Sequence, residues 1–195
     1  MSKTENVSKW IELFGDKITE NKDTLNKLDT AIGDGDHGSN LTRGAAAVKE
    51  KMEETTYDNL SDIFRDVGMT LVSKVGGASG PLYGTAFIEM AKKAKETEDM
   101  GEILEAGLFG IQKRGKAEVG EKTMIDEWSP VIEQIKTEGL TEQVIADSLE
   151  NTRDMKATKG RASYLGDRSI GHIDPGAQSS AYLFETLLEA GVLNE

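Results

Sequence analysis

The sequence predicts an all-α protein, because its apolar residues recur at helical spacing along most of the chain. We count eight amphipathic stripes of this kind and no confident strand. No low-complexity linker or fixed-period repeat divides them. A chain of 195 residues is long enough to bury one adequate core, so we expect a single domain over residues 1–195.

Each stripe has apolar side chains at spacings of three, four or seven residues, which places them on one face of a helix. Trp10, Ile11, Phe14 and Ile18 show the pattern in the first stripe. The stripes, in chain order, cover residues 10–18, 41–52, 60–71, 82–94, 103–111, 125–135, 144–152 and 182–188. We therefore expect a bundle of eight helices.

The connections between the stripes are of two kinds. Some are plain solvated turns, such as residues 54–58 and 136–139. Four others are rich in glycine and small polar residues, and they cover residues 29–40, 76–85, 115–124 and 160–176. Because such loops on a rigid scaffold commonly carry function, we expect the site to lie in these four.

The composition excludes several classes of function. The formal net charge of −12 makes nucleic acid and anionic membrane surfaces unlikely partners in general. The chain has no cysteine, so it forms no disulfide, thiolate nucleophile or zinc–thiolate site. No run approaches the ~18 apolar residues of a membrane span, and the N-terminus lacks the apolar stretch of a signal peptide. We expect a cytoplasmic acidic protein.

The first glycine-rich loop contains the hexapeptide Gly33-Asp34-Gly35-Asp36-His37-Gly38. It matches the dinucleotide-binding pattern G-x-G-x-x-G, but its carboxylates would repel a phosphate unless a cation lay between them. Asp29, Asp34 and Asp36 offer hard oxygen ligands, the type that suits Mg²⁺ or Ca²⁺. The glycines let the loop curl so that these carboxylates converge.

A calcium EF-hand does not fit this loop. If Asp34 is position 1, position 12 is Ala45 instead of glutamate, and position 6 is Ser39 instead of glycine. Magnesium fits better, since it takes few carboxylates and completes its octahedron with water and phosphates. The alternative is an acidic turn that caps the next helix, with Asp36 or Ser39 as N-cap.

The second loop leads into a helix at Ser79, a plausible N-cap, with Pro81 in the first turn. Its free N–H groups could bind an anion, although simple packing of small residues explains the glycines equally well. The third loop resembles a Walker A element, but Glu121 precedes the lysine and no strand leads into it. We reject a P-loop; Gly115 and Met124 could still wall a pocket, or Met124 could belong to the core.

The fourth loop ends in Asp174-Pro175, a strong signal for the start of the last helix. Arg161 and Arg168 could pair with phosphate oxygens or form exposed ion pairs. His37 and His172 are the only histidines, and each lies in one of the glycine-rich loops. Together the loops supply the parts of a metal–nucleotide site, provided that they gather at one end of the bundle.

Several blocks of the sequence, in the same order, resemble the nucleotide-binding L subunits (DhaL) of dihydroxyacetone kinases. These blocks are Leu28-Asp29, Ile32–Gly38, Gly76–Leu82, Arg114–Ala117, Gly120–Met124, Lys159–Gly166 and Ser169–Ala177, and the match spans nearly the whole chain. The resemblance implies a barrel of eight antiparallel amphipathic helices with the nucleotide in loops at one end.

The resemblance also implies roles for individual residues. Asp29, Asp34 and Asp36 would hold two Mg²⁺ ions that bridge to the phosphates of ADP or ATP. The residues expected to contact the nucleotide are His37, Gly38, Ser39, Asn40, Ala78, Ser79, Gly115, Met124, Arg161, Asp174, Pro175 and Gly176. No catalytic residue is expected on this chain beyond that site.

For the activity, the resemblance implies a phosphotransferase-dependent kinase. ADP would stay bound as a cofactor, a phosphohistidine of a DhaM-type subunit would recharge it, and the γ-phosphoryl would pass to dihydroxyacetone on a DhaK-type subunit. The alternatives are direct use of ATP, a nucleotide-dependent regulatory module, and a phosphocarrier using His37 or His172. A homodimer, a transcription-factor contact and the identity of the accepting ketose stay open.

Overall fold

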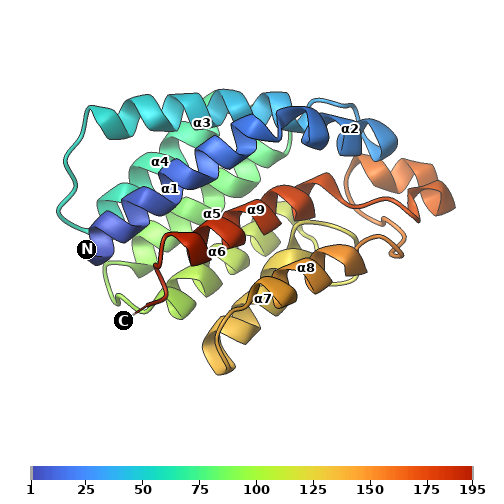
Figure 1. The fold of residues 1–195 in the computed structure, drawn as a ribbon. Helices are drawn as coiled ribbons and strands as arrows, with labels where there is room; N and C mark the ends of the chain where they lie inside the picture. Colours follow the sequence, from blue (N-terminus) through green and yellow to red (C-terminus); the bar gives the residue numbers. More distant parts are fainter. Residues whose placement is uncertain (1, 195) are drawn as a thin grey trace.

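The computed structural model describes residues 2–194, and within them it contains nine α-helices, one 3₁₀ helix and no strand (Figure 1). The helices are α1 (Lys3–Glu20), α2 (Lys22–Ile32), α3 (His37–Glu53), α4 (Leu60–Lys74), α5 (Ser79–Lys93), α6 (Met100–Gly115), α7 (Ile125–Thr137), α8 (Glu142–Asn151), the 3₁₀ helix η1 (Arg161–Ser169) and α9 (Pro175–Glu189). The prediction of an all-α protein is confirmed.

Seven of the helices form a closed ring. Contacts run from α1 to α3, then through α4, α5, α6 and α7 to α9, which packs back against α1. α8 packs against both α7 and α9, whereas α2 and η1 lie together at one end of the ring (Figure 1). The closed ring agrees with the expected barrel, and α2 and η1 at its end carry parts of two of the four glycine-rich loops, residues 29–40 and 160–176.

Polar residues fix where several helices begin. The Ser2 hydroxyl accepts the N–H of Glu5, and the Glu5 carboxylate accepts the N–H of Ser2, which is a complete capping box at α1. Asp99 and Asp174 cap α6 and α9 with their side chains, and Pro175 occupies the first turn of α9. The predicted start of the last helix is therefore confirmed.

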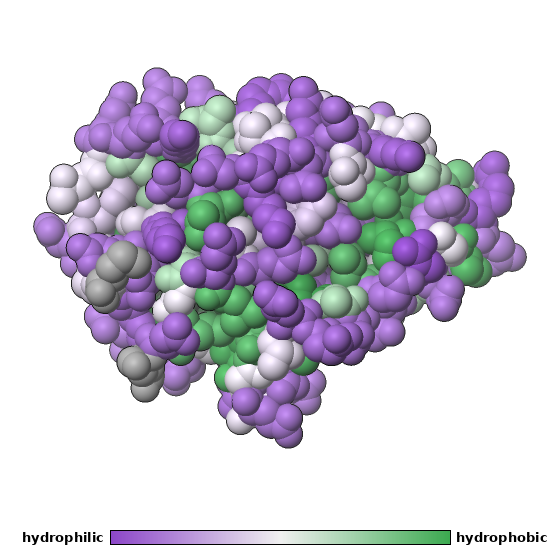
Figure 2. Space-filling model, viewed as in Figure 1, coloured by the Kyte–Doolittle hydropathy of each residue, from purple (hydrophilic) through white to green (hydrophobic). Residues whose placement is uncertain are grey.

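The ring interior is filled by large apolar side chains. Trp10, Phe64 and Phe87 contact one another at ring-centroid distances of 6.2–6.3 Å, and all three are buried. The indole N–H of Trp10 donates to the carbonyl of Leu183 over 2.8 Å, so the first and last helices are joined inside the core. Hydrophilic residues cover most of the face drawn in Figure 2, and hydrophobic ones show in patches between them.

A cavity of about 740 Å³ also lies among the helices. Apolar side chains of α1, α3, α4 and α5 line it, among them Phe14, Leu41, Leu71 and Tyr83. Within residues 2–194, no helix is long and apolar enough to cross a membrane.

The expected count of eight helices is wrong, because α2 was not expected and η1 lies inside a segment expected to be a loop. Residues 29–40 are mostly helical: Asp29–Ile32 end α2 and His37–Asn40 begin α3, so only residues 33–36 form the connection. Residues 160–176 contain η1, which is bent at Gly166, where φ is +56°. Short or partly polar helices give too weak a periodicity to be recognised.

Candidate metal and nucleotide site

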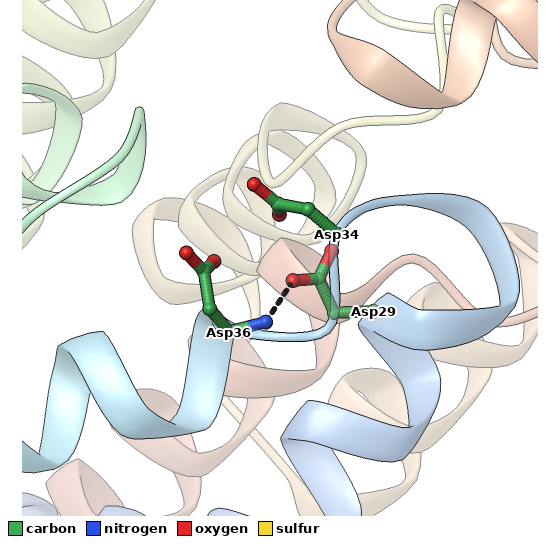
Figure 3. Close-up of side chains that lie close together, drawn as sticks. All are labelled: Asp29, Asp34 and Asp36. Carbon is green, nitrogen blue, oxygen red and sulfur yellow. Dashed lines mark hydrogen bonds between the residues drawn. The ribbon is translucent and has the colours of Figure 1, made fainter.

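Asp29 lies in the last turn of α2 and is buried. Its Oδ2 accepts the backbone N–H of Asp36 over 2.9 Å (Figure 3) and that of His37 over 3.0 Å; neither N–H has a partner within α3. Neither Asp36 nor Ser39 provides the side-chain cap considered from the sequence, since Asp29 of another helix takes that role. This hydrogen bonding fixes the loop between α2 and α3.

The loop glycine Gly33 leaves room for Asp29. A Cβ on Gly33 would collide with Oδ1 of Asp29, the oxygen that does not cap α3. Burial raises the pKa of Asp29, and the two backbone hydrogen bonds oppose that rise. The glycine therefore keeps one carboxylate oxygen free to act as a ligand.

Ligand oxygens of Asp29, Asp34 and Asp36 lie within 4.8 Å of one another, as the sequence predicted. Asp34 and Asp36 are exposed, and the carboxyl groups of all three gather around the loop (Figure 3). Arg161 of η1 reaches Asp34 with an N–O distance of 3.2 Å, so the arginine predicted for this site is beside the carboxylates.

A pocket of about 380 Å³ adjoins these carboxylates. Its walls include the first residues of four helices, α3, α5, α7 and α9, or the residues just before them. Each helix N-terminus carries a partial positive charge, which favours an anion, although side chains already accept some N–H groups at the starts of α3 and α9. The arrangement thus places carboxylates and anion-binding helix ends side by side.

Most of the residues expected to contact the nucleotide line this pocket together with the three aspartates. These lining residues are His37, Asn40, Ala78, Ser79, Met124, Arg161, Asp174, Pro175 and Gly176. Gly38, Ser39 and Gly115 are not among them. The N–H and hydroxyl of Ser39 are both bonded to the Asn26 side chain of α2, at 2.9 Å each, and Gly115 lies beside Leu82.

The imidazole of His37 is directed into the protein. Its Nε2 lies 2.9 Å from the hydroxyl of Ser179 on α9. Burial lowers the pKa of His37 to about 4, although Asp36 and Asp34 oppose this shift, so the ring is neutral at pH 7. The His37 side chain therefore joins α3 to α9.

Asp174 is a second buried carboxylate in the pocket wall. Its Oδ2 accepts the N–H of Ala177 over 2.9 Å and so caps α9. Burial raises the pKa of Asp174 to about 7, while the hydrogen bond from Ala177 and the charge of Lys122 lower it. This side chain is a structural cap at the edge of the pocket.

Lys122 is the residue whose role the sequence did not reveal. Its side chain is buried, and its ammonium group donates to the carbonyls of Thr152, Arg153, Met155 and His172. It thereby ties the end of α8 to the segment that leads into α9. The near match to a Walker A element drew attention to this lysine, but only the fold shows that it binds carbonyls.

The fold and the site can now be compared with known proteins. The model of the DAK2 domain family matches residues 31–189. The chain is 54% identical over 188 residues to the "PEP-dependent dihydroxyacetone kinase 1, ADP-binding subunit DhaL" of Listeria innocua, covering 94% of this chain and 95% of that one. It is 56% identical over 180 residues to the "PTS-dependent dihydroxyacetone kinase, ADP-binding subunit DhaL" of Lactococcus lactis, covering 92% and 94%.

A solved structure agrees with these relatives. The dihydroxyacetone kinase of C. freundii in complex with AMP-PNP and Mg²⁺ matches with a TM-score of 0.78 and 26% identity. The match covers 97% of this chain and 34% of the other, so this chain spans about a third of that kinase. The chain belongs to the DAK2 domain family and, within it, to the DhaL subunits of PEP- or PTS-dependent dihydroxyacetone kinases.

Proposed function

We propose that this chain is the nucleotide-binding subunit of a phosphotransferase-dependent dihydroxyacetone kinase, with ADP held as a cofactor. The observation that carries the proposal is the pocket in which three converging carboxylates meet the N-terminal ends of four helices. The high identity to ADP-binding DhaL subunits over almost their full length supports it. Residues 1–195 would act as one domain.

The residues present fit a divalent metal. All three candidate ligands are hard carboxylate oxygens, and the space that Gly33 leaves open is next to Oδ1 of Asp29. We propose that Asp29, Asp34 and Asp36 hold two Mg²⁺ ions. When bound, the metal neutralises charge between these carboxylates and the phosphates of the nucleotide.

The chain's own groups would position the nucleotide. The N-termini of α3, α5, α7 and α9 offer partial positive charge to the phosphates, and Arg161 adds a guanidinium at the same edge. Met124 and Leu82 supply apolar surface in the same pocket. Because phosphoryl transfer needs mainly orientation and charge neutralisation, no nucleophile on this chain is required.

The reaction then depends on two partner subunits. A DhaM-type subunit would donate a phosphoryl group from its phosphohistidine to ADP, and the resulting ATP would pass its γ-phosphoryl to dihydroxyacetone on a DhaK-type subunit. The relatives are named as "PEP-dependent" and "PTS-dependent" kinase subunits, which favours this relay over direct use of free ATP. Neither a homodimer nor a transcription-factor contact is supported, so neither forms part of the proposal.

A phosphocarrier role for His37 is disfavoured by the geometry. Its Nε2 is hydrogen-bonded to Ser179 of α9, and burial lowers the pKa of the ring to about 4. Phosphorylation there would break this bond and place a charged group in a buried position, which is costly.

The test is native mass spectrometry of the purified chain with Mg²⁺ present. We expect one ADP and two Mg²⁺ ions to travel with the wild-type protein. Asp34→Ala should lose the nucleotide, and Asp16→Ala, which removes an exposed carboxylate from α1, should retain it. Retention of ADP by Asp34→Ala would contradict the metal bridge, and a wild-type chain that binds no ADP would contradict the function.

A second measurement separates the relay from direct use of ATP. With the DhaK-type subunit and dihydroxyacetone present, the relay predicts that free ATP supports at most a single turnover while ADP stays bound. Continuous turnover with ATP alone, without a phosphohistidine donor, would assign the chain to the ATP-dependent alternative.

A further inference from the structure

A buried cluster of hydrogen bonds lies behind the pocket, which we call the inner cluster. It consists of His37, Tyr83, Trp128, Ser179 and Ser180. The last four are at most 1% exposed. Each member lies at or near the N-terminal end of its helix, and together they come from α3, α5, α7 and α9. These are the four helices whose N-terminal ends line the pocket.

Tyr83 is at the centre of this cluster. Its hydroxyl lies 2.6 Å from the hydroxyl of Ser179 and 3.0 Å from that of Ser180. Ser180 accepts the indole N–H of Trp128 over 3.0 Å and donates to the carbonyl of Gly176 over 2.7 Å. A single side chain of α5 thus reaches both serines of α9, and through them α7.

The inner cluster is also connected to the loop between α2 and α3, residues 33–36, which we call the acidic loop. Ser179 bonds to Nε2 of His37, and the backbone N–H of His37 donates to Asp29. The hydroxyl of Ser179 also lies 3.1 Å from the carbonyl of Gly176, in the pocket wall. The cluster therefore contacts both the wall expected to face the nucleotide and the loop that carries the carboxylates.

The protons of the cluster can be assigned without leaving a donor unpaired. Trp128 donates to Ser180, Ser180 donates to Gly176, and Tyr83 donates to Ser179 across the shortest contact. Ser179 then donates to Gly176 and accepts the proton on Nε2 of the neutral imidazole of His37, so every donor of the cluster has a partner. The 3.0 Å contact of Tyr83 with Ser180 is left without a proton of its own. Fully paired buried networks of this kind rigidify what they connect.

We propose that Tyr83, Ser179 and Ser180 are positioning residues of the nucleotide site, which hold its four helix ends in register with the acidic loop. The proposal rests on the proposed function, because it assumes that Mg²⁺ and ADP bind in this pocket. None of the three hydroxyls is expected to touch the metal; they act through His37 and Gly176.

The test measures ADP binding by calorimetry at several Mg²⁺ concentrations for wild type, Tyr83→Phe and Ser179→Ala. Each variant should weaken ADP binding and raise the half-saturating Mg²⁺ concentration by about tenfold, the effect typical of residues that support metal ligands. Tyr182→Phe, on α9 outside the cluster, should bind as wild type. The double variant should be no weaker than the weaker single variant, because both changes break one connected unit.

The imidazole signals in NMR spectra provide a readout that a general loss of stability would not move. The chain has only two histidines, His37 and His172, so the His37 signal can be assigned with a His172 variant. Ser179→Ala and Tyr83→Phe should shift the His37 nitrogen signals, and Tyr182→Phe should not. Wild-type affinity and unshifted signals in both variants would overturn the proposal. If the wild-type chain itself binds no ADP, the proposed function fails first, and the proposal fails with it.

Discussion

At the scale of single residues, the site depends on a position where no side chain fits. Gly33 stands against the free oxygen of Asp29, and that oxygen is oriented because its partner oxygen caps α3. The sequence predicted the three carboxylates from their spacing. It did not reveal that Asp29 has two tasks, because one of them depends on the packing of α2 against α3.

Replacing Gly33 with alanine tests this arrangement. The added Cβ would push Oδ1 of Asp29 away, so we expect Mg²⁺ affinity to fall at least about tenfold while the helices stay intact. Gly15→Ala is the matched control, since a Cβ there would make only an ordinary contact at 3.5 Å with Ala45. Metal titration followed by calorimetry measures the Mg²⁺ affinity of both variants, and circular dichroism checks that their helices stay intact. Unchanged affinity in Gly33→Ala would refute the role of the glycine.

Glu127 on α7 is a buried carboxylic acid with no hydrogen-bond partner for either oxygen within residues 2–194. Burial, together with the nearby charge of Glu185, raises the pKa of Glu127 to about 9. Between the unfolded value of 4.5 and about 9, the folded state therefore binds more protons than the unfolded state. Stability from this group is complete below pH 4.5 and is lost as the pH rises towards 9.

Glu127→Gln should remove this pH dependence. Relative to wild type, the variant should gain at most about 1.4 kcal/mol of unfolding free energy for each pH unit from 5 to 9. Glu133→Gln, an exposed change on the same helix, should leave the slope unaltered. Urea unfolding at pH 5, 7 and 9 measures the free energy of unfolding of each protein. Parallel pH profiles for Glu127→Gln and wild type would contradict a raised pKa of Glu127 in the folded state.

At the scale of elements, the segment between α8 and α9 is held by one buried cation. Lys122 donates to carbonyls at the end of α8, in the following turn and just before α9. The C-terminal end of α8 carries partial negative charge, which favours an ammonium group there. The segment that leads to Asp174 and the pocket is therefore held in place by a lysine of the third loop, residues 115–124.

Lys122→Met should loosen that segment. Several buried carbonyls would lose their donor, so we expect a loss of about 2–4 kcal/mol in unfolding free energy. Amide hydrogen exchange should increase most in residues 152–172. Lys136→Met, which removes an exposed ion pair with Glu105, is the control and should change little. Equal exchange in that segment for Lys122→Met and wild type would contradict the proposed role of Lys122 in holding it.

The elements also explain where prediction from sequence stopped. In α2 the inward positions are Leu25, Asp29 and Ile32, so the middle of its buried stripe is a carboxylate. Hydrophobic periodicity cannot recognise a helix whose buried face carries a carboxylate. Likewise, the bond between Ser39 and Asn26 joins residues on two helices, and nothing in either local sequence indicates it.

At the scale of the whole molecule, the long amphipathic helices were predictable because their stripes face a shared core. The closure of the ring was not predictable from the pattern alone, since it depends on which helices become neighbours. Most of the candidate site residues do line one pocket, as the resemblance implied. The inner cluster escaped prediction because Tyr83 and Ser179 are 96 residues apart and look like ordinary core positions.

The overall charge gives a prediction about salt. With a net charge of −12, any salt should relieve some repulsion, but Mg²⁺ should stabilise further by binding the three aspartates. At a Mg²⁺ concentration of 100 times its dissociation constant, the gain is about 2.7 kcal/mol. Calorimetric melting in MgCl₂ and NaCl of equal ionic strength tests this. Asp34→Asn should abolish the difference between the salts, and equal melting shifts in wild type would contradict metal binding.

The contact of α9 with α1 closes the ring between the first and last helices, so the pocket is completed only after α9 has been synthesised. The acidic loop is complete by residue 36, yet Pro175 and Gly176 of the pocket wall belong to the last helix of the ring and are synthesised much later. Contacts between such distant segments form late, since a long loop of chain must close first. A ribosome-bound chain that ends before α9 would therefore have the carboxylates without the opposite wall. Nucleotide retention would then distinguish chains that contain α9 from chains that stop before it.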